Sequence, residues 1–316
     1  MSGITKYLSF GEESTYGVEA TTYAETVDPS TASLDPAGDD KLILDGIAGL
    51  HRVAGLGVYS TAGEVSIPVD DAATGWFWKW ALGGYDVTGD TGSYTHTFSP
   101  QLGGLMTPFT CAVGKDHFEH IFTGNVISEI SLEADSEWAN LSVSLVGARD
   151  SRGELNDEVE YTEGTMFTAP DGRLVSGQTD RSADINSVSL SISTGAEVAE
   201  SAGFGSRFPT KATRGAMEAT LELSLAFDSM DELVGFWGDT QGPSTDHIAE
   251  ESYTLSFGDA LDIVIPRTVA TSSSQPADGA GTITQTVTLR GLYDTTTRSG
   301  PVEVHLTNDR ESYTIN

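Results

Sequence analysis

A strand followed at once by a short aromatic helix occurs twice in this chain, and this unit constrains the fold more than any other feature. In the first copy, Gly63–Val69 alternates apolar with polar residues, which is typical of a strand with one buried face. Asp71 is predicted to cap a helix that runs to Leu82, and Gly83 is predicted to end it. The unit therefore predicts a sheet with a helix packed on one side.

The first helix carries three tryptophans, Trp76, Trp78 and Trp80. Trp76 and Trp80 share one helical face because they lie four residues apart, and we interpret them as a plug that covers the sheet. Trp78 faces nearly the other way and needs a second surface, which another subunit could provide. With Trp237 of the second copy, these residues are our candidates for packing between subunits.

The second copy begins with Met217–Phe227, which alternates apolar and polar residues along its whole length. Ser229 and Glu232 have the spacing of a capping box, and Leu233 shares one apolar helical face with Phe236 and Trp237. Strand, capped helix and tryptophan thus recur in the same order.

The similarity continues downstream, since Tyr253–Phe257 corresponds to Tyr94–Phe98 and Thr286–Asp294 corresponds to Ser142–Asp150. Four elements in one order with similar spacing predict two tandem copies of a β module. We therefore predict an all-β fold with one short helix per module. The predicted divisions are an N-terminal arm (1–50), a first module (51–152), a linker or extended loop (153–184) and a second module (185–316).

The charge balance excludes several classes of partner. The chain has 16 basic and 47 acidic residues, a formal net charge of −31 spread along the sequence. Phosphate contacts need Lys and Arg, so affinity for nucleic acids or anionic membranes is not expected. Life in molar salt and repulsion of a polyanion would both favour such a composition, and composition does not separate them. No run approaches the ~20 apolar residues of a membrane helix, and the start of the chain lacks the apolar core of a signal peptide, so we expect a soluble, non-secreted protein.

Signals of catalysis are absent from the sequence. It has no nucleophile elbow, Walker loop or dinucleotide fingerprint, and its one cysteine, Cys111, lies in a predicted buried strand. His117 and His120 are the nearest approach to a metal cluster, but residues three apart on a strand point to opposite faces. We predict no catalytic residue, no metal and no cofactor, hence no enzyme.

Three stretches together resemble the tail tube proteins of long-tailed, non-contractile viruses: Gly63–Val69 with the aromatic helix, Tyr94–Pro100, and Phe122–Leu132 with Leu141–Leu145. The resemblance implies β-sandwich or barrel modules whose inner strands join those of other copies in stacked rings. Viral DNA would pass through the lumen without specific binding. Three two-module chains, or alternatively six, would form a ring, with tape-measure and tail-end proteins as further partners. The protein would be assembled in the host cytoplasm and reside in the virion tail, and the acidic composition favours a virus of a halophilic archaeon.

If the resemblance holds, the barrel wall is expected to comprise Val53–Val69, Ile185–Ile192 and Met217–Phe227. Glu64, Glu218 and Glu222 would then lie on the polar strand face as candidates to line the lumen, unless they are ordinary solvated carboxylates. The N-terminal arm and residues 154–173 are candidates for contacts between rings. The alternative interpretation is a β-sandwich binding or adhesin module that recognises glycans or a surface through exposed aromatic residues.

Overall fold

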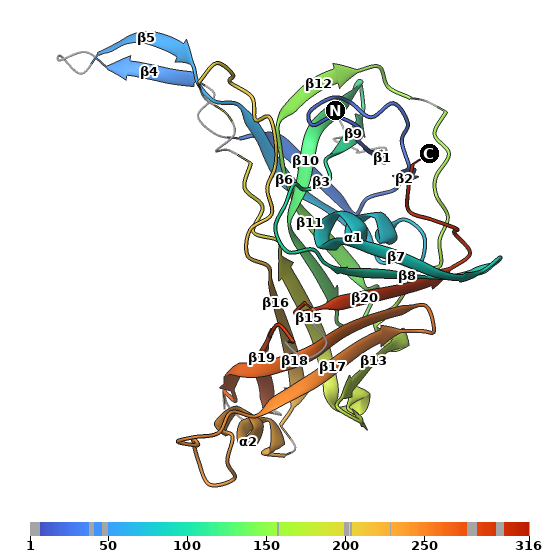
Figure 1. Cartoon of the computed structure of the whole chain (residues 1–316), viewed down its shortest axis with the longest axis vertical. Coiled ribbons are helices and arrows are strands. Elements are labelled where there is room, and N and C mark those ends of the chain that lie inside the picture. The colour runs from blue at the N-terminus through green and yellow to red at the C-terminus, as the bar shows by residue number, and fades with distance from the viewer. Residues whose placement is uncertain are drawn as a thin grey trace.

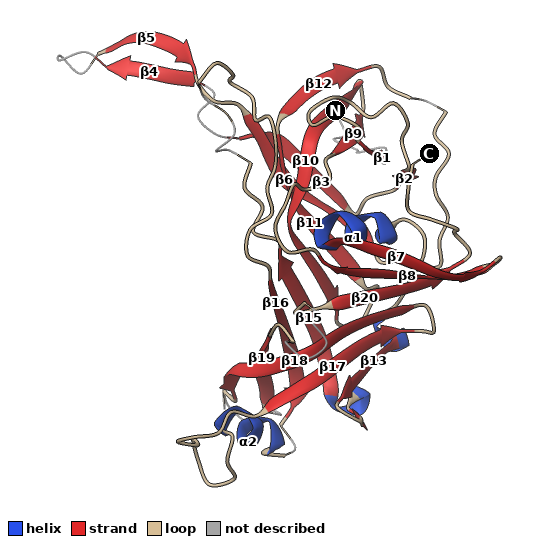
Figure 2. Ribbon diagram, in the orientation of Figure 1, coloured by secondary structure: helices blue, strands red, loops and turns tan. Residues whose placement is uncertain are grey.

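The computed structural model describes residues 7–37, 41–45, 50–156, 158–198, 202, 204–227, 229–276, 283–294 and 300–315. Strands dominate the elongated molecule, and the helices are short (Figure 2). The predicted all-β fold is confirmed. None of the helices in the described part of the chain is long and apolar enough to cross a membrane.

The elements have the following bounds. The strands are β1 (Tyr7–Glu12), β2 (Glu25–Val27), β3 (Thr31–Ala37), β4 (Lys41–Asp45), β5 (His51–Leu56), β6 (Ser60–Pro68), β7 (Gly83–Asp90), β8 (Ser93–Pro100), β9 (Phe109–Lys115), β10 (Phe118–Ala134), β11 (Asn140–Gly147), β12 (Arg149–Gly153), β13 (Gly172–Ser176), β14 (Thr179–Asp180), β15 (Ile185–Ser193), β16 (Glu218–Ala226), β17 (Glu250–Phe257), β18 (Leu261–Ser274), β19 (Thr284–Gly291) and β20 (Glu303–Asn308). The helices are α1 (Thr74–Leu82) and α2 (Asp231–Trp237), with the 3₁₀ turns η1 (Ala169–Asp171) and η2 (Ser182–Asp184).

Eight strands form one continuous antiparallel sheet, which we call the wall. Its order is β3, β6, β11, β10, β15, β16, β19 and β18. In β6, β11, β15, β16 and β19, alternate residues are buried, so one face of the wall contacts the hydrophobic core and the other is polar. The β10–β15 pairing joins strands from the two halves of the chain.

The two halves of the wall repeat the same pairing in detail. Val65 of β6 lies opposite Val143 of β11, and Leu223 of β16 lies opposite Val287 of β19. A β-bulge interrupts β10 between Ile127 and Glu129, and another interrupts β18 between Ala270 and Ser272.

The bulged residues also make the same hydrogen bond. Ser128 Oγ donates to the Ser144 carbonyl at 3.1 Å, and Thr271 Oγ1 donates to the Thr288 carbonyl at 3.1 Å. Because bulges are specific local features, their coincidence aligns β3–β6–β11–β10 with β15–β16–β19–β18 residue by residue.

Two long strands leave the wall and enter a second layer. The first part of β10 pairs with β9 and β12, and the first part of β18 pairs with β17 and β20. In β10 the change of direction falls at Gly124, where φ is +69°, and at Asn125, whose Nδ2 donates to the Phe109 and Phe122 carbonyls at 3.0 and 2.7 Å. Side-chain hydrogen bonding lets one strand continue through this bend.

The pairings among the described strands branch but never return to their starting strand. One branch runs from β10 through β9 and β1 to β2, and another runs from β18 through β20 and β8 to β7. The sheet of a single chain is therefore open, and β3 and the second part of β18 are the two edges of the wall.

Helix α1 fills the space between the wall and the second layer (Figure 1). Trp80 stacks on Phe109 with ring centroids 4.2 Å apart and meets Phe10 edge-on at 5.8 Å. The N-terminus of α1 is held by Asp70, whose Oδ1 accepts hydrogen bonds from the Ala72 and Thr74 amides at 3.1 and 3.0 Å. The sequence predicted Asp71 as the cap, but the residue that caps the helix is its neighbour Asp70. Gly83 ends the helix as predicted, with φ of +87°.

Helix α2 is packed quite differently from α1. None of its residues is buried, and Phe236 is 40% exposed. Glu232 does not close the predicted capping box; its Oε1 lies 2.7 Å from Arg181 Nη2. The second helix lacks the cover that β1, β9 and the C-terminal segment give to α1.

The arm and the linker contain more strand than expected. Strands β1 and β2 pair with the second layer and β3 pairs with β6, so the described arm belongs largely to the sheet. Strand β13, in the expected linker, pairs with β17. The expected Val53–Val69 strand is two elements, because β5 pairs with β4 in a hairpin that projects from the body (Figure 1).

Candidate functional site

The polar face of the wall carries a regular alternation of hydroxyl and carboxylate side chains. One row of directly paired residues crosses six strands, and it reads Ser33, Glu64, Ser144, Glu129, Ser193 and Glu218. A second row crosses five strands, and it reads Glu133, Ser189, Glu222, Thr288 and Ser272. No two carboxylates are directly opposite each other within these rows.

This alternation keeps like charges apart. Neighbouring strands lie about 4.8 Å apart, so carboxylates on alternate strands are separated by roughly 10 Å, close to the Debye length at 0.1 M salt. Hydroxyls on the same face supply hydrogen bonds: Ser191 Oγ donates to Glu129 Oε1 at 2.5 Å, and Ser272 Oγ donates to Thr288 Oγ1 at 2.9 Å. The face can therefore be strongly acidic without the repulsion that adjacent carboxylates would cause.

The face is acidic overall. Five glutamates on it are exposed: Glu64, Glu129, Glu133, Glu218 and Glu222. Asp35 of β3 is exposed as well. Among the described residues of the eight wall strands, the basic side chains on this side are Arg290, which pairs with Glu218, and Arg267, which pairs with Glu250.

The structure places the three predicted carboxylates, Glu64, Glu218 and Glu222, on this one face. Sequence reasoning missed Asp35, Glu129 and Glu133. Glu129 was hidden because the bulge at Ser128 shifts the alternation by one residue. Asp35 was missed because its strand lies in a segment interpreted as a loop-rich arm.

The four predicted packing aromatics fall into two groups. Trp76, Trp78 and Trp80 are at most 2% exposed and contact residues of their own chain. Trp237 of α2 is partly exposed, and it is the one of the four at the molecular surface. The indole nitrogens of Trp76 and Trp80 donate to Glu25 and Glu12 at 3.1 and 3.2 Å, which satisfies these polar groups inside the fold.

The histidine pair does not form a metal site. His117 is exposed, whereas His120 Nε2 lies 2.8 Å from Asp150 Oδ2. Burial alone would raise the pKa of Asp150, but hydrogen bonds from Tyr59 and His120 outweigh burial and hold the pKa below its ordinary value. Within the described ranges, no three His, Cys, Asp or Glu side chains come together as metal ligands.

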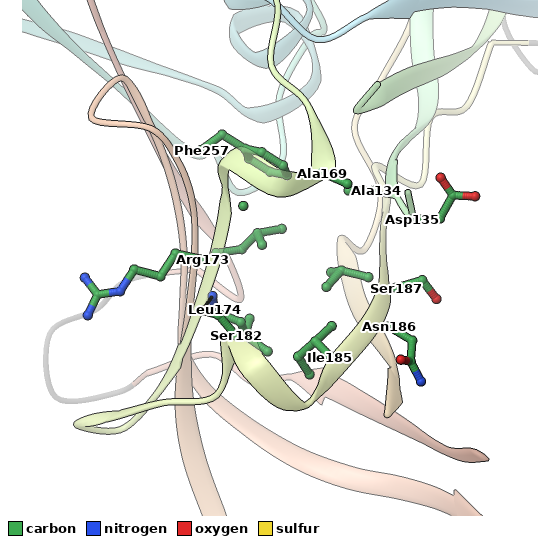
Figure 3. A pocket seen from close by; sticks show the side chains of 13 residues that line it. Ala134, Asp135, Ala169, Arg173, Leu174, Ser182, Ile185, Asn186, Ser187 and Phe257 are labelled. Atoms are coloured by element: carbon green, nitrogen blue, oxygen red, sulfur yellow. Dashed lines mark hydrogen bonds between the residues drawn. The ribbon is translucent and has the colours of Figure 1, made fainter. Parts of the chain in front are cut away.

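A cavity of about 70 Å³ lies between β13, η2 and the start of β15. Its inner lining is mainly aliphatic and aromatic, including Leu174, Ile185 and Phe257 (Figure 3). The charged groups of Asp135 and Arg173 point away from it (Figure 3). It has room for about two water molecules, far less than the ~300 Å³ or more of a typical ligand pocket.

A family model described as "Phage tail tube protein" matches residues 3–291. A search of curated proteins found no match to the chain.

Proposed function

This chain belongs to the phage tail tube protein family, and we propose that it is the major subunit of a hollow tail tube through which viral DNA is delivered. It is a structural tail component of the virion. The observation that carries the proposal is the open, eight-stranded wall with an acidic hydroxyl–carboxylate face. Stacked rings of this wall would form the conduit, with the acidic face toward the lumen.

The strand number supports assembly of several copies. Eight strands closed on themselves would make a barrel filled by its own side chains, whereas barrels of about 16 or more strands enclose water. We propose three copies per ring, in which each chain supplies two modules and the six modules give pseudo-sixfold symmetry. With 24 strands spaced about 4.8 Å and tilted about 40°, the backbone diameter would be roughly 48 Å.

The chemistry of the polar face suits the passage of DNA. Carboxylates such as Glu64, Glu218 and Glu222 repel phosphates, and in the described part of this face Arg290 and Arg267 are paired with carboxylates, so DNA has little to bind. The hydroxyls keep the face hydrated. DNA would therefore slide through without being held.

The remaining assembly contacts extend the same proposal. The arm and residues 154–173 would meet neighbouring rings, Trp237 would pack against another subunit, and tape-measure and tail-end proteins would bind the ends of the tube. The tail would be long and non-contractile, as the resemblance implies, and the protein would be assembled in the host cytoplasm. The acidic composition supports a virus of a halophilic archaeon. The rival binding-module hypothesis depended on exposed clustered aromatics, but Trp76, Trp78 and Trp80 are buried.

Electron microscopy of the purified protein in molar and in low salt tests this function. We expect rings or tubes with an open lumen, and their symmetry would distinguish three copies from six. A uniform monomer at high protein concentration in molar salt would refute the proposal, and binding to glycans would then be measured.

A further inference from the structure

The seam between the two halves of the wall is made by β10 and β15. Ile130 lies opposite Ile192, and Ser131 lies opposite Ser191. The Thr194 amide donates to the Ser128 carbonyl at 2.9 Å, so on this strand the amides of even-numbered residues face β10. Ile130–Ile192 is thus a hydrogen-bonded pair, and Ser131–Ser191 is a non-hydrogen-bonded pair.

The residue-by-residue alignment of the two halves identifies the counterparts of these strands. The matching bulges align Ser128 with Thr271, and hence Ser131 with Ser274. The pairings of β3 with β6 and of β15 with β16 align Asp35 with Ser191. Strand β18 is therefore the counterpart of β10, and β3 is the counterpart of β15.

These two counterparts are the edges that the chain leaves open. Within the described part of the chain, no strand pairs with the outer side of β3 or with the outer side of β18 beyond Val269. Ser33, Asp35, Ser272 and Ser274 are all exposed. A sheet edge with unpaired backbone groups favours the addition of another strand.

We propose that β18 of one copy pairs with β3 of the next copy in the register of the internal β10–β15 seam. Ser272 then lies opposite Ala37, Ser274 opposite Asp35, and Gln275 opposite Leu34. This inference rests on the proposed tube function, and it specifies which strands, and which residues, close the ring.

Both edges must remain soluble in the free subunit before they pair, and the side chains of the β18 edge fit this requirement. Where the internal seam has Ile130 and Leu132 facing the core, the β18 edge has Ser273 and Gln275. Ser273 Oγ accepts hydrogen bonds from Gln275 Nε2 at 2.7 Å and Gln285 Nε2 at 3.2 Å, so its polarity is satisfied within the chain. The edge therefore exposes little apolar surface in the free subunit.

Pro36 protects the other edge. It is the counterpart of Ile192, so its nitrogen faces outward rather than toward β6. A proline in this orientation leaves the β3–β6 ladder intact and removes one donor from the free edge. The seam between copies would then lack the backbone hydrogen bond that an amide at residue 36 would donate. For the same reason, the β3 edge of the free subunit is a poorer template for incorrect pairing.

Disulfide trapping tests the register. The double variant Asp35→Cys/Ser274→Cys joins a non-hydrogen-bonded pair on the polar face, where Cα atoms approach to about 4.5 Å, a separation that a disulfide spans. The two positions lie at opposite edges of one wall, roughly 34 Å apart, so a bond between them must join two copies. Native Cys111 is buried, and burial raises the pKa of its thiol, so it should not compete.

Two matched variants are the controls. Ser131→Cys/Ser191→Cys places the same pair in the internal seam and should form a bond within one chain. Ser33→Cys/Ser272→Cys is displaced by four residues, about 13 Å, and should not cross-link. On a non-reducing gel, the Asp35/Ser274 variant should give covalent dimers and a closed product with the number of copies in one ring.

The outcomes separate this inference from the tube function. Rings or tubes under the electron microscope with no Asp35–Ser274 cross-link, while the internal control is oxidised, would overturn the register and leave the function intact. Cross-linking of the displaced pair with equal yield would overturn it as well. Absence of any ring would instead refute the proposed function.

Discussion

Replacing Gly75 with alanine should reverse the usual effect of this substitution in a helix. Alanine in place of a helical glycine normally stabilises a protein by about 0.5–1 kcal/mol. In α1, however, a Cβ at residue 75 would lie 2.1 Å from Cζ and 2.4 Å from the hydroxyl oxygen of Tyr313. Tyr313 is fully buried against Trp76 with ring centroids 5.5 Å apart, so it cannot move without opening the core.

The size of the effect follows from the cost of overpacking the core and the gain in helix propensity. Overpacking a rigid core costs about 1–3 kcal/mol, and helix propensity returns up to about 1 kcal/mol. We therefore expect Gly75→Ala to lower the free energy of unfolding by about 1–2 kcal/mol. Gly235 of α2 is the matched control, because a Cβ there meets no atom within 4 Å; Gly235→Ala should raise the free energy by up to about 1 kcal/mol.

Urea unfolding of the full chain, followed by tryptophan fluorescence, measures both variants. A double-mutant cycle with Tyr313→Ala isolates the contact. Tyr313→Ala alone should cost about 3–5 kcal/mol, but adding Gly75→Ala to it should be neutral or stabilising because the ring is gone. The reasoning fails if Gly75→Ala stabilises the otherwise unchanged protein as much as Gly235→Ala does.

Three further predictions concern the Asp70 cap, the buried carboxyl of Glu13 and the acidic face of the wall. Asp70→Ala removes the acceptor for the Ala72 and Thr74 amides and should lower the free energy of unfolding by about 1–2 kcal/mol in urea; the neighbouring Asp71→Ala, which keeps that cap, should cost less. Burial raises the pKa of Glu13 in the folded protein, despite hydrogen bonds from Gly124, Thr110 and Gly17. The stability that Glu13 contributes is therefore complete below its pKa in the unfolded chain, near 4.5, and is lost as pH rises through its higher pKa in the folded protein. Glu13→Gln should therefore reduce the loss of stability between pH 4.5 and 7, and an unchanged slope of unfolding free energy against pH would contradict this. Glu64→Lys with Glu222→Lys should leave tubes intact, since both side chains are exposed, but make them retain duplex DNA at low salt in a filter-binding assay. The corresponding glutamine pair is the control, and equal DNA retention by all three proteins would argue against a lumen-facing position.

The sequence predicted the regular elements well where alternation was uninterrupted. Met217–Phe227 became β16 within a residue at each end, and the aromatic helix and its terminal Gly83 were identified. These elements are determined by local pattern: apolar residues at the period of a strand, and a glycine with positive φ at the end of a helix.

Features that depend on distant contacts were not predictable. Residues 118–134 form one strand because Asn125 bonds to the Phe109 carbonyl in another strand. Asp35 joined the polar face only through the pairing of β3 with β6. The contrast between buried α1 and exposed α2 likewise depends on which distant segments cover each helix. The spacing of apolar residues within one helix does not predict which segments those are.

That contrast has a consequence for the outside of an assembled ring. With three copies, the inner surface would repeat every 60°, because both halves of the wall share the same pairing. The outer surface would repeat only every 120°, with the covered α1 alternating with the uncovered α2. In such a ring, a ligand that recognises α2 would decorate the tube at three positions per ring.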